Sequence, residues 1–220
     1  MTMSIRIPFQ ALVLTTLLTL TPLAPAVASE AGGPPQDTAP QTDAAAAAVP
    51  TRDFGRPHPD AAPELVQFAF LIGHWRCDVD YLTGDWKTRV QSEAEWTAYY
   101  IQDGRAIMDD FRGGFGEGYL ATTVRVFDRQ REGWRGYWID GQRGRWSDAL
   151  VGSQTDFGMR LETGMRAPDP SGKPIDIHLR YEFHDIEADR FHWRQNASTD
   201  GGTTWQTGTA TLDCKRQAGP

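Results

Sequence analysis

The sequence predicts an all-β protein: an antiparallel up-and-down β-barrel of about ten strands, with a short helix at its N-terminal side. Three observations support this prediction. Apolar and polar residues alternate with a period of two, turn signals recur at short intervals, and no helical periodicity separates the segments. Ten short strands at this spacing indicate a meander, and closing it into a barrel removes exposed edges. A two-sheet sandwich is the structural alternative.

The first 62 residues are expected to lie outside the barrel domain. Residues 1–28 have the parts of a signal peptide, with Arg6, the apolar run ALVLTTLLTL and the small residues Ala-Val-Ala at 26–28. Residues 29–62 are rich in Ala, Pro and Gly, so they cannot form a core and are predicted to be a disordered tether. The domain at 63–216 is therefore expected to be exported, periplasmic or extracellular, with no stable membrane anchor.

The composition disfavours several classes of function. The formal net charge is −7, and an acidic chain without a basic stripe disfavours nucleic acid and anionic lipid as partners. The chain has no G-x-S-x-G, no phosphate-binding glycine loop and no convincing metal-ligand spacing. The sequence therefore predicts no cofactor, no metal site and no identifiable catalytic residue.

The elements of the domain follow from local patterns. The segment PELVQFAFLIG begins with Pro63 and ends with Gly73, which is typical of one or two turns of helix. Turn signals such as QDG, DRQREG and DPSG separate the segments that follow it. Strands with clear alternation are expected at 74–81, 86–96 and 175–183, and weaker ones at 105–111, 119–127, 134–139, 145–151, 155–162, 190–197 and 203–214.

The pairing of two late strands can be predicted from their faces. Residues 175–183 and 190–197 both carry their apolar side chains at odd positions. Only pairings whose residue numbers add to an even total keep both apolar faces together. Pairing Phe183 with Phe191 meets this condition and places His192 opposite Glu182.

The chain has two cysteines, one in the first predicted strand and one in the last. Cys77 and Cys214 both belong to the apolar face of their strand. The first and last strands of a closed barrel are neighbours, and cysteines of exported proteins are commonly oxidised. We therefore expect a disulfide between them, with two separate buried thiols as the alternative.

Short motifs carry a resemblance to a known family. Gly73-His74-Trp75 resembles the G-x-W of lipocalins, and the segments REGWRGYWIDGQRG and FHDIEADRFHWRQNASTDGGTTW extend the likeness. The chain looks like a family of bacterial lipocalin-like proteins that is catalogued as a domain of unknown function. This resemblance implies one calycin-like barrel and no particular reaction. It also implies a basic residue after the last strand, Lys215 or Arg216, packed over the tryptophan.

Eight tryptophans are many for a chain of this length. If the apolar strand faces point inward, the barrel interior is aromatic and suits a flat apolar ligand. The alternative is that the rings simply fill the barrel. The residues predicted to contact a ligand are Trp75, Trp86, Trp96, Trp138, Trp146, Tyr181, Phe183 and Trp193.

Three histidines fall on the polar face of one predicted hairpin. His178 and His184 are six residues apart on one strand, about 20 Å, which is too far to share a metal ion. We therefore predict that these two and His192 are solvated surface residues. A haem site would need an inward histidine, and none is expected.

Three carboxylates interrupt mainly apolar segments and are candidate acid–base groups. They are Asp109, Asp110 and Asp148, and a buried carboxylate would have a shifted pKa. The alternation in these strands is ambiguous, so the sequence does not tell which of them face inward. Arg105, Arg125 and Arg135 are possible ion-pair partners.

The stretch STDGGTTW fits the Asp-box signature S-x-D-x-G-x-x-W that recurs in sialidases. A sialidase carries several such boxes on successive propeller blades, whereas this chain has one. We predict a hairpin turn, in which Asp200 accepts backbone N–H bonds and Gly201 and Gly202 take positive φ. Trp205 then anchors the next strand.

These observations predict an exported protein that binds a small hydrophobic or amphipathic molecule in a barrel cavity. One alternative is an enzyme acting on a small apolar substrate inside the barrel, with Asp110 or Asp148 as acid or base. Another is a carbohydrate-binding or structural envelope domain.

Overall fold

The computed structural model of the chain describes residues 54–218. The predicted signal peptide and residues 29–53 of the predicted tether lie outside the described residues. Within the described part, no helix has the length and apolarity that crossing a bilayer requires. The elements are η1 (Pro63–Leu71), β1 (Gly73–Leu82), β2 (Arg89–Ile101), β3 (Ala106–Gly113), β4 (Leu120–Asp128), β5 (Gly133–Asp140), β6 (Arg145–Trp146), β7 (Leu150–Thr155), β8 (Gly158–Pro168), β9 (Pro174–His184), β10 (Arg190–Ser198) and β11 (Gln206–Arg216).

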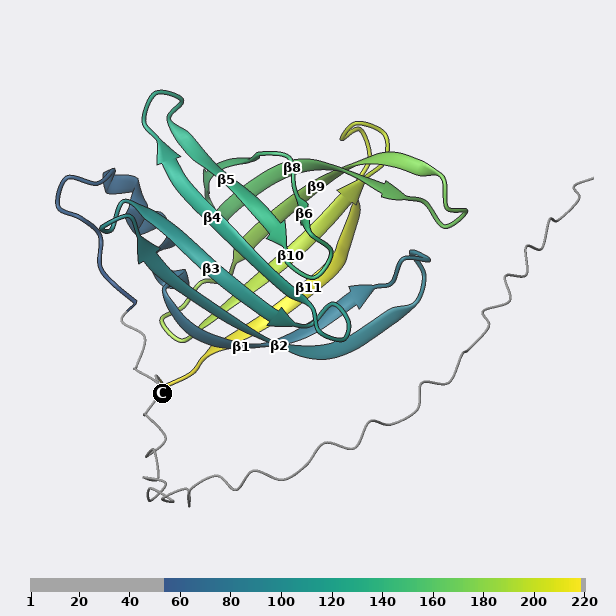
Figure 1. The fold of residues 1–220 in the computed structure, drawn as a ribbon, viewed down its shortest axis with the longest axis horizontal. Coiled ribbons are helices and arrows are strands. Elements are labelled where there is room, and N and C mark those ends of the chain that lie inside the picture. Colours follow the sequence, from purple (N-terminus) through teal and green to yellow (C-terminus); the bar gives the residue numbers. More distant parts are fainter. Residues whose placement is uncertain (1–53, 219–220) are drawn as a thin grey trace, which may run out of the picture. The chain divides into compact units, whose positions relative to one another are not determined.

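Ten of these strands form one closed antiparallel barrel (Figure 1). With β6 left aside, each strand pairs with the next along the chain, so that β5 pairs with β7, and β1 pairs with β11 to close the sheet. The two-residue strand β6 pairs with the end of β5 and lies outside the barrel. The predicted up-and-down barrel of about ten strands with a short N-terminal helix is therefore confirmed.

The predicted strand 145–151 is wrong, because the structure divides it into β6 and the start of β7. Between the two, Ser147 bonds both backbone groups of Trp138: its N–H donates to the Trp138 carbonyl at 2.9 Å, and its Oγ accepts from the Trp138 N–H at 3.0 Å. Ser147 thus accepts from Trp138 with its side-chain oxygen in place of its carbonyl, and the pairing with β5 shifts by one residue between β6 and β7. The strand resumes at Leu150 and continues to Thr155.

The predicted register of the β9–β10 hairpin is wrong by two residues. Phe183 pairs with Trp193 rather than Phe191, and His192 lies opposite His184 rather than Glu182. The turn closes with a hydrogen bond from Glu187 N to the Arg190 carbonyl at 2.8 Å. Two residues, 185 and 186, therefore lie opposite the single residue Phe191, which makes a β-bulge. Asp185 has a φ of +49°, as expected for the first residue of such a bulge. Because of this extra residue, the numbers of paired residues on β9 and β10 still add to an even total, so the apolar faces of the two strands lie on the same side of the sheet.

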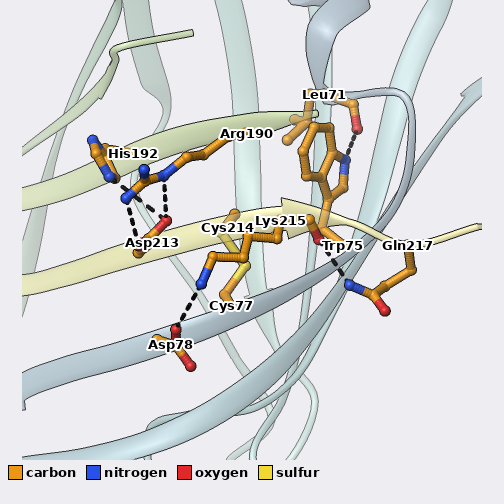
Figure 2. The surroundings of a disulfide bond; sticks show 10 residues. All are labelled: Leu71, Trp75, Cys77, Asp78, Arg190, His192, Asp213, Cys214, Lys215 and Gln217. Carbon is orange, nitrogen blue, oxygen red and sulfur yellow. Dashed lines mark hydrogen bonds and ion pairs between the residues drawn. A yellow bond between two sulfur atoms is a disulfide. The ribbon is translucent and has the colours of Figure 1, made fainter. Parts of the chain in front are cut away.

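The disulfide joins the two strands whose pairing closes the barrel. Cys77 and Cys214 are directly opposite in the β1–β11 register, with Cα atoms 4.0 Å apart and a sequence separation of 137 (Figure 2). Both side chains are fully buried in the core. The predicted disulfide is confirmed, and a disulfide fits a compartment outside the cytoplasm.

One end of the barrel is closed by η1. Phe68 of this helix is fully buried, with ring centroids 4.7 Å from Trp134 and 5.5 Å from Phe183. The Trp75 indole N–H donates to the Leu71 carbonyl at 2.8 Å (Figure 2), which fixes the helix over the first strand. The helix therefore seals the end of the barrel where β1 begins.

Arg216, at the end of β11, fastens this helix. Its guanidinium lies 4.1 Å from the centre of the Trp75 ring, and it donates to the carbonyls of Phe70 at 2.9 Å and Ile72 at 2.7 Å. This is the basic residue over the tryptophan that the sequence led us to expect. Lys215 instead faces solvent and pairs with Asp78 at 3.5 Å.

Replacing Arg216 by Ala is expected to lower the free energy of unfolding by roughly 2 kcal/mol, because it removes a cation–π contact and the hydrogen bonds that hold η1. Lys215→Ala is the matched control, since its exposed ion pair is worth about 1 kcal/mol or less. Urea unfolding of both variants measures the difference. Equal losses would show that Arg216 does not fasten the helix.

Residues 54–62, which the sequence assigns to the tether, contact the barrel. The Tyr100 N–H donates to the Phe54 carbonyl at 2.9 Å, and the His58 N–H donates to the Gly104 carbonyl at 3.0 Å. Ala62 is buried in the core beside η1. The folded domain therefore includes these residues and starts before the predicted boundary at residue 63.

Candidate ligand-binding cavity

The barrel encloses a cavity of about 800 Å³. The closed end lies beneath η1, where Phe183 belongs both to the cavity wall and to the contact with Phe68. At the other end the cavity reaches exposed residues of the β1–β2 turn, the β5–β7 connection and the β8–β9 turn. These rim residues are Gly84, Arg143, Arg145, Trp146, Asp148, Arg166 and Pro168. The cavity is thus a pocket with one closed end and one mouth.

Seven of the eight aromatic residues predicted to contact a ligand line this cavity. They are Trp86, Trp96, Trp138, Trp146, Tyr181, Phe183 and Trp193. Trp75 does not line it, because its ring is fully buried beneath η1 and Arg216. The aromatic rings therefore do not fill the barrel, and contact between them and a ligand stays a prediction.

Ring packing fixes much of the cavity wall. Tyr181 of β9 and Trp193 of β10 stack with centroids 5.4 Å apart, and Trp96 of β2 meets Phe111 of β3 edge-on at 5.4 Å. Burial raises the pKa of the Tyr181 phenol, so this side chain is neutral at physiological pH. The wall therefore presents flat, uncharged surfaces that are held in place before any ligand enters.

Asp109 and Arg125 form a buried ion pair in the cavity wall. They come from the neighbouring strands β3 and β4, both side chains face inward, and the guanidinium Nη2 contacts the carboxylate. The side chains are 2% and 3% exposed, respectively. The guanidinium carbon also lies 4.8 Å from the centre of the Phe68 ring, which places the pair at the closed end.

This ion pair leaves hydrogen-bonding capacity unused. The Nε and Nη1 atoms of Arg125 are buried and have no hydrogen-bond partner among the described residues. Such donors in a buried site are costly unless water or a ligand satisfies them. Burial lowers the pKa of Arg125 and raises that of Asp109, while the attraction between them opposes both shifts. Arg125 therefore places an unsatisfied guanidinium in the wall at the closed end of the cavity, where neighbouring protein atoms cover both of these nitrogen atoms.

The structure places the three candidate carboxylates in different settings. Asp109 faces the cavity but is held by Arg125, so it is not a free acid or base. Asp110 faces outward and accepts a hydrogen bond from Thr122 Oγ1 at 2.8 Å. Asp148 is exposed at the mouth. Of the three arginines suggested as partners, Arg125 alone pairs with one of these carboxylates.

Two of the predicted surface histidines lie closer together than the sequence indicates. His184 Nδ1 and His192 Nδ1 are 2.8 Å and 3.0 Å from the same Asp185 Oδ2 atom. His178 is exposed further along β9 and is not part of this group. Nothing in the sequence indicates that His184 and His192 lie together, because the predicted register placed His192 opposite Glu182.

The Asp-box stretch forms a hairpin turn, as predicted. The Asp200 carboxylate accepts from Thr204 N at 2.9 Å and from Thr204 Oγ1 at 2.6 Å, and these bonds lower its pKa to about 2. Gly201 and Gly202 have φ values of +72° and +87°. The Trp205 indole N–H donates to the Gly202 carbonyl at 3.0 Å. The motif therefore has a structural role between β10 and β11.

No family model and no curated protein matches the chain. The chain is similar to the crystal structure of Rv2717c from M. tuberculosis, with 17% sequence identity, a TM-score of 0.49, and coverage of 72% of this chain and 100% of that chain. A similarity of this size carries no conclusion about activity. The strand pairing shows the closed barrel, whereas membership in a lipocalin-like family stays a prediction.

Proposed function

We propose that this protein binds one small amphipathic molecule inside the barrel. The observation that supports the proposal is an apolar cavity of about 800 Å³ whose closed end holds a buried guanidinium with two unpaired N–H donors. Ligand sites in proteins are typically about 300–1,000 Å³, mostly apolar, with a few convergent polar groups. This cavity has each of these properties.

The arrangement indicates how a ligand lies in the cavity. Its polar group lies beside Arg125 at the closed end, where an acceptor oxygen takes hydrogen bonds from Nε or Nη1 once the guanidinium rotates toward the cavity. Its apolar part extends along Trp96, Tyr181 and Trp193 toward the mouth. Because Asp109 already balances the charge of Arg125, the acceptor oxygen belongs to an uncharged group, namely a carbonyl, a hydroxyl or a protonated carboxyl.

The proposal includes export. The Cys77–Cys214 disulfide supports a site of action outside the cytoplasm, since thiols are kept reduced in the cytosol. The signal-peptide pattern at residues 1–28 supports the same route. A barrel that carries or stores an apolar molecule in an aqueous compartment shields that molecule from water.

Filling the cavity tests the proposal. Leu179 is buried on the inner face of β9 and lines the cavity, so Leu179→Trp places a larger ring inside it. We expect the wild-type protein to bind one equivalent of a dansyl-labelled fatty acid with increased dansyl fluorescence. We expect Leu179→Trp to weaken this binding by about tenfold or more, which corresponds to about 1.4 kcal/mol.

His178→Trp is the matched control. His178 precedes Leu179 on β9 and is exposed on the outer face, so the same ring is added outside the barrel. This variant is expected to bind the probe as the wild type does. Equal affinity of all three proteins would place the probe elsewhere and contradict the proposal. Circular dichroism spectra that match the wild type confirm that each variant is folded.

A further inference from the structure

A second group of side chains lies on the outer surface, away from the cavity. His184 ends β9, Asp185 is the bulge residue that follows it, and His192 lies opposite His184 on β10. One ligand atom from each of the three lies within 4.8 Å of the others. Both imidazole Nδ1 atoms lie close to a single carboxylate oxygen, at 2.8 Å and 3.0 Å. The bulge at Asp185 is therefore what brings these three groups together.

We propose that His184, Asp185 and His192 bind a divalent transition-metal ion of the zinc type. Two imidazole nitrogens and one carboxylate oxygen are ligands that Zn²⁺ prefers, with bonds of about 2.0–2.2 Å. Tetrahedral bonds of this length set neighbouring ligand atoms about 3.3 Å apart. The three side chains need to move only by small rotations from their present positions. They are 25%, 68% and 29% exposed, so such rotations meet little resistance and the ion has access.

The far side of His192 supports the proposal independently. Its Nε2 atom lies 3.6 Å from Asp213 Oδ1 on the neighbouring strand β11 (Figure 2). Arg190 holds the Asp213 carboxylate with two hydrogen bonds, at 2.9 Å and 2.7 Å. A metal-bound histidine usually donates its other N–H to a carboxylate, which fixes the ring and its tautomer. Asp213 is placed to accept that bond when His192 Nδ1 binds the ion.

The surroundings also favour a cation. The β9–β10 turn carries Asp185, Glu187 and Asp189, and Asp213 adds a fourth carboxylate. Two guanidinium groups lie against them, because Arg190 pairs with Asp213 and Arg216 donates to the Ala188 carbonyl at 2.8 Å. This excess of negative charge attracts a divalent ion. His184, His192 and Asp213 also line an outer groove of about 510 Å³ whose lining residues come from β9, β10, β11, β1 and β2. The groove leaves room for water molecules to complete the coordination.

Titration of the whole protein, prepared without an affinity tag, with Zn²⁺ alone tests the proposal. We expect isothermal titration calorimetry to show one Zn²⁺ per chain. His184→Gln and His192→Gln are each expected to weaken binding at least tenfold, and Asp213→Asn by about tenfold. His178→Gln is the matched control, because it removes an exposed histidine from the same strand without touching the group. It is expected to bind Zn²⁺ as the wild type does.

A measurement on the wild type alone covers the case in which a variant does not fold. Zn²⁺ is expected to shift the imidazole NMR signals of His184 and His192 and to leave those of His178 unchanged. If Asp185 serves only as a hydrogen-bond acceptor for the two rings, no stoichiometric binding is detected. Absence of binding, or equal effects on the three histidines, would overturn the proposal. Neither result depends on whether the cavity holds a ligand.

Discussion

Reduction of the Cys77–Cys214 disulfide is expected to lower the free energy of unfolding by roughly 5 kcal/mol on the chain-entropy model. The bond joins residues 137 apart in sequence and links the first barrel strand to the last. Without it, the unfolded chain regains the freedom of a long loop, while the folded barrel keeps the β1–β11 hydrogen bonds. The expected loss is a large part of the stability of an ordinary domain.

Urea unfolding of the oxidised and reduced protein measures this loss. The Cys77→Ala/Cys214→Ala double variant is the control, since a reducing agent should change the midpoint of the wild type and leave that of the variant unchanged. Identical midpoints for the oxidised and reduced wild type would mean that the two cysteines are not bonded in the isolated protein.

Asp109→Ala is expected to destabilise the barrel by about 3–5 kcal/mol. The substitution leaves the Arg125 guanidinium buried next to Phe68 without its counter-ion. Replacing both partners, as Asp109→Leu with Arg125→Met, removes the two buried charges together and is expected to recover most of the loss. Asp110→Ala is the matched control on the outer face, with an expected loss of about 1 kcal/mol.

The Arg125→Met variant adds a dependence on pH. Without Arg125, burial raises the folded-state pKa of Asp109 further above its unfolded value. A carboxyl group with a raised folded-state pKa binds more protons when folded, so its contribution to stability is present at low pH and declines as the pH rises through that pKa. Urea unfolding of this variant should therefore show higher stability at pH 4 than at pH 7, relative to the double variant. Equal profiles would mean that Asp109 is not buried.

The alternation of side chains was sufficient to predict the barrel and its closure. Trp75, Cys77 and Val79 share one face of the first strand, and the same face of the last strand carries Cys214. Because side chains on a strand alternate strictly, these faces predicted the disulfide, and the structure meets the condition that the apolar faces point inward. The aromatic lining followed from the same argument, which is why seven of the eight predicted residues line the cavity.

Backbone features that the alternation does not encode account for what was missed. The tight turn closed by Glu187 and Arg190, together with the bulge at Asp185, sets the β9–β10 register two residues from the predicted one, and this hid the proximity of His184 and His192. The inward direction of Asp109 depends on the β2–β3 turn, where Gln102 and Asp103 both have positive φ and set the pairing of Ala98 with Asp109. Neither backbone conformation is evident from residue types alone. The sequence therefore did not predict the Asp109–Arg125 ion pair at the closed end of the cavity, which the structure shows.

Native mass spectrometry of the protein purified from the cells that produce it tests the central claim most directly. We expect a fraction of the protein to carry one additional small mass, and denaturation in organic solvent should release that molecule as an amphipathic compound with an acceptor oxygen. The Leu179→Trp variant, purified in the same way, should carry less of it. Repeated spectra that show only the mass of the chain, for the wild type as for the variant, would contradict the account.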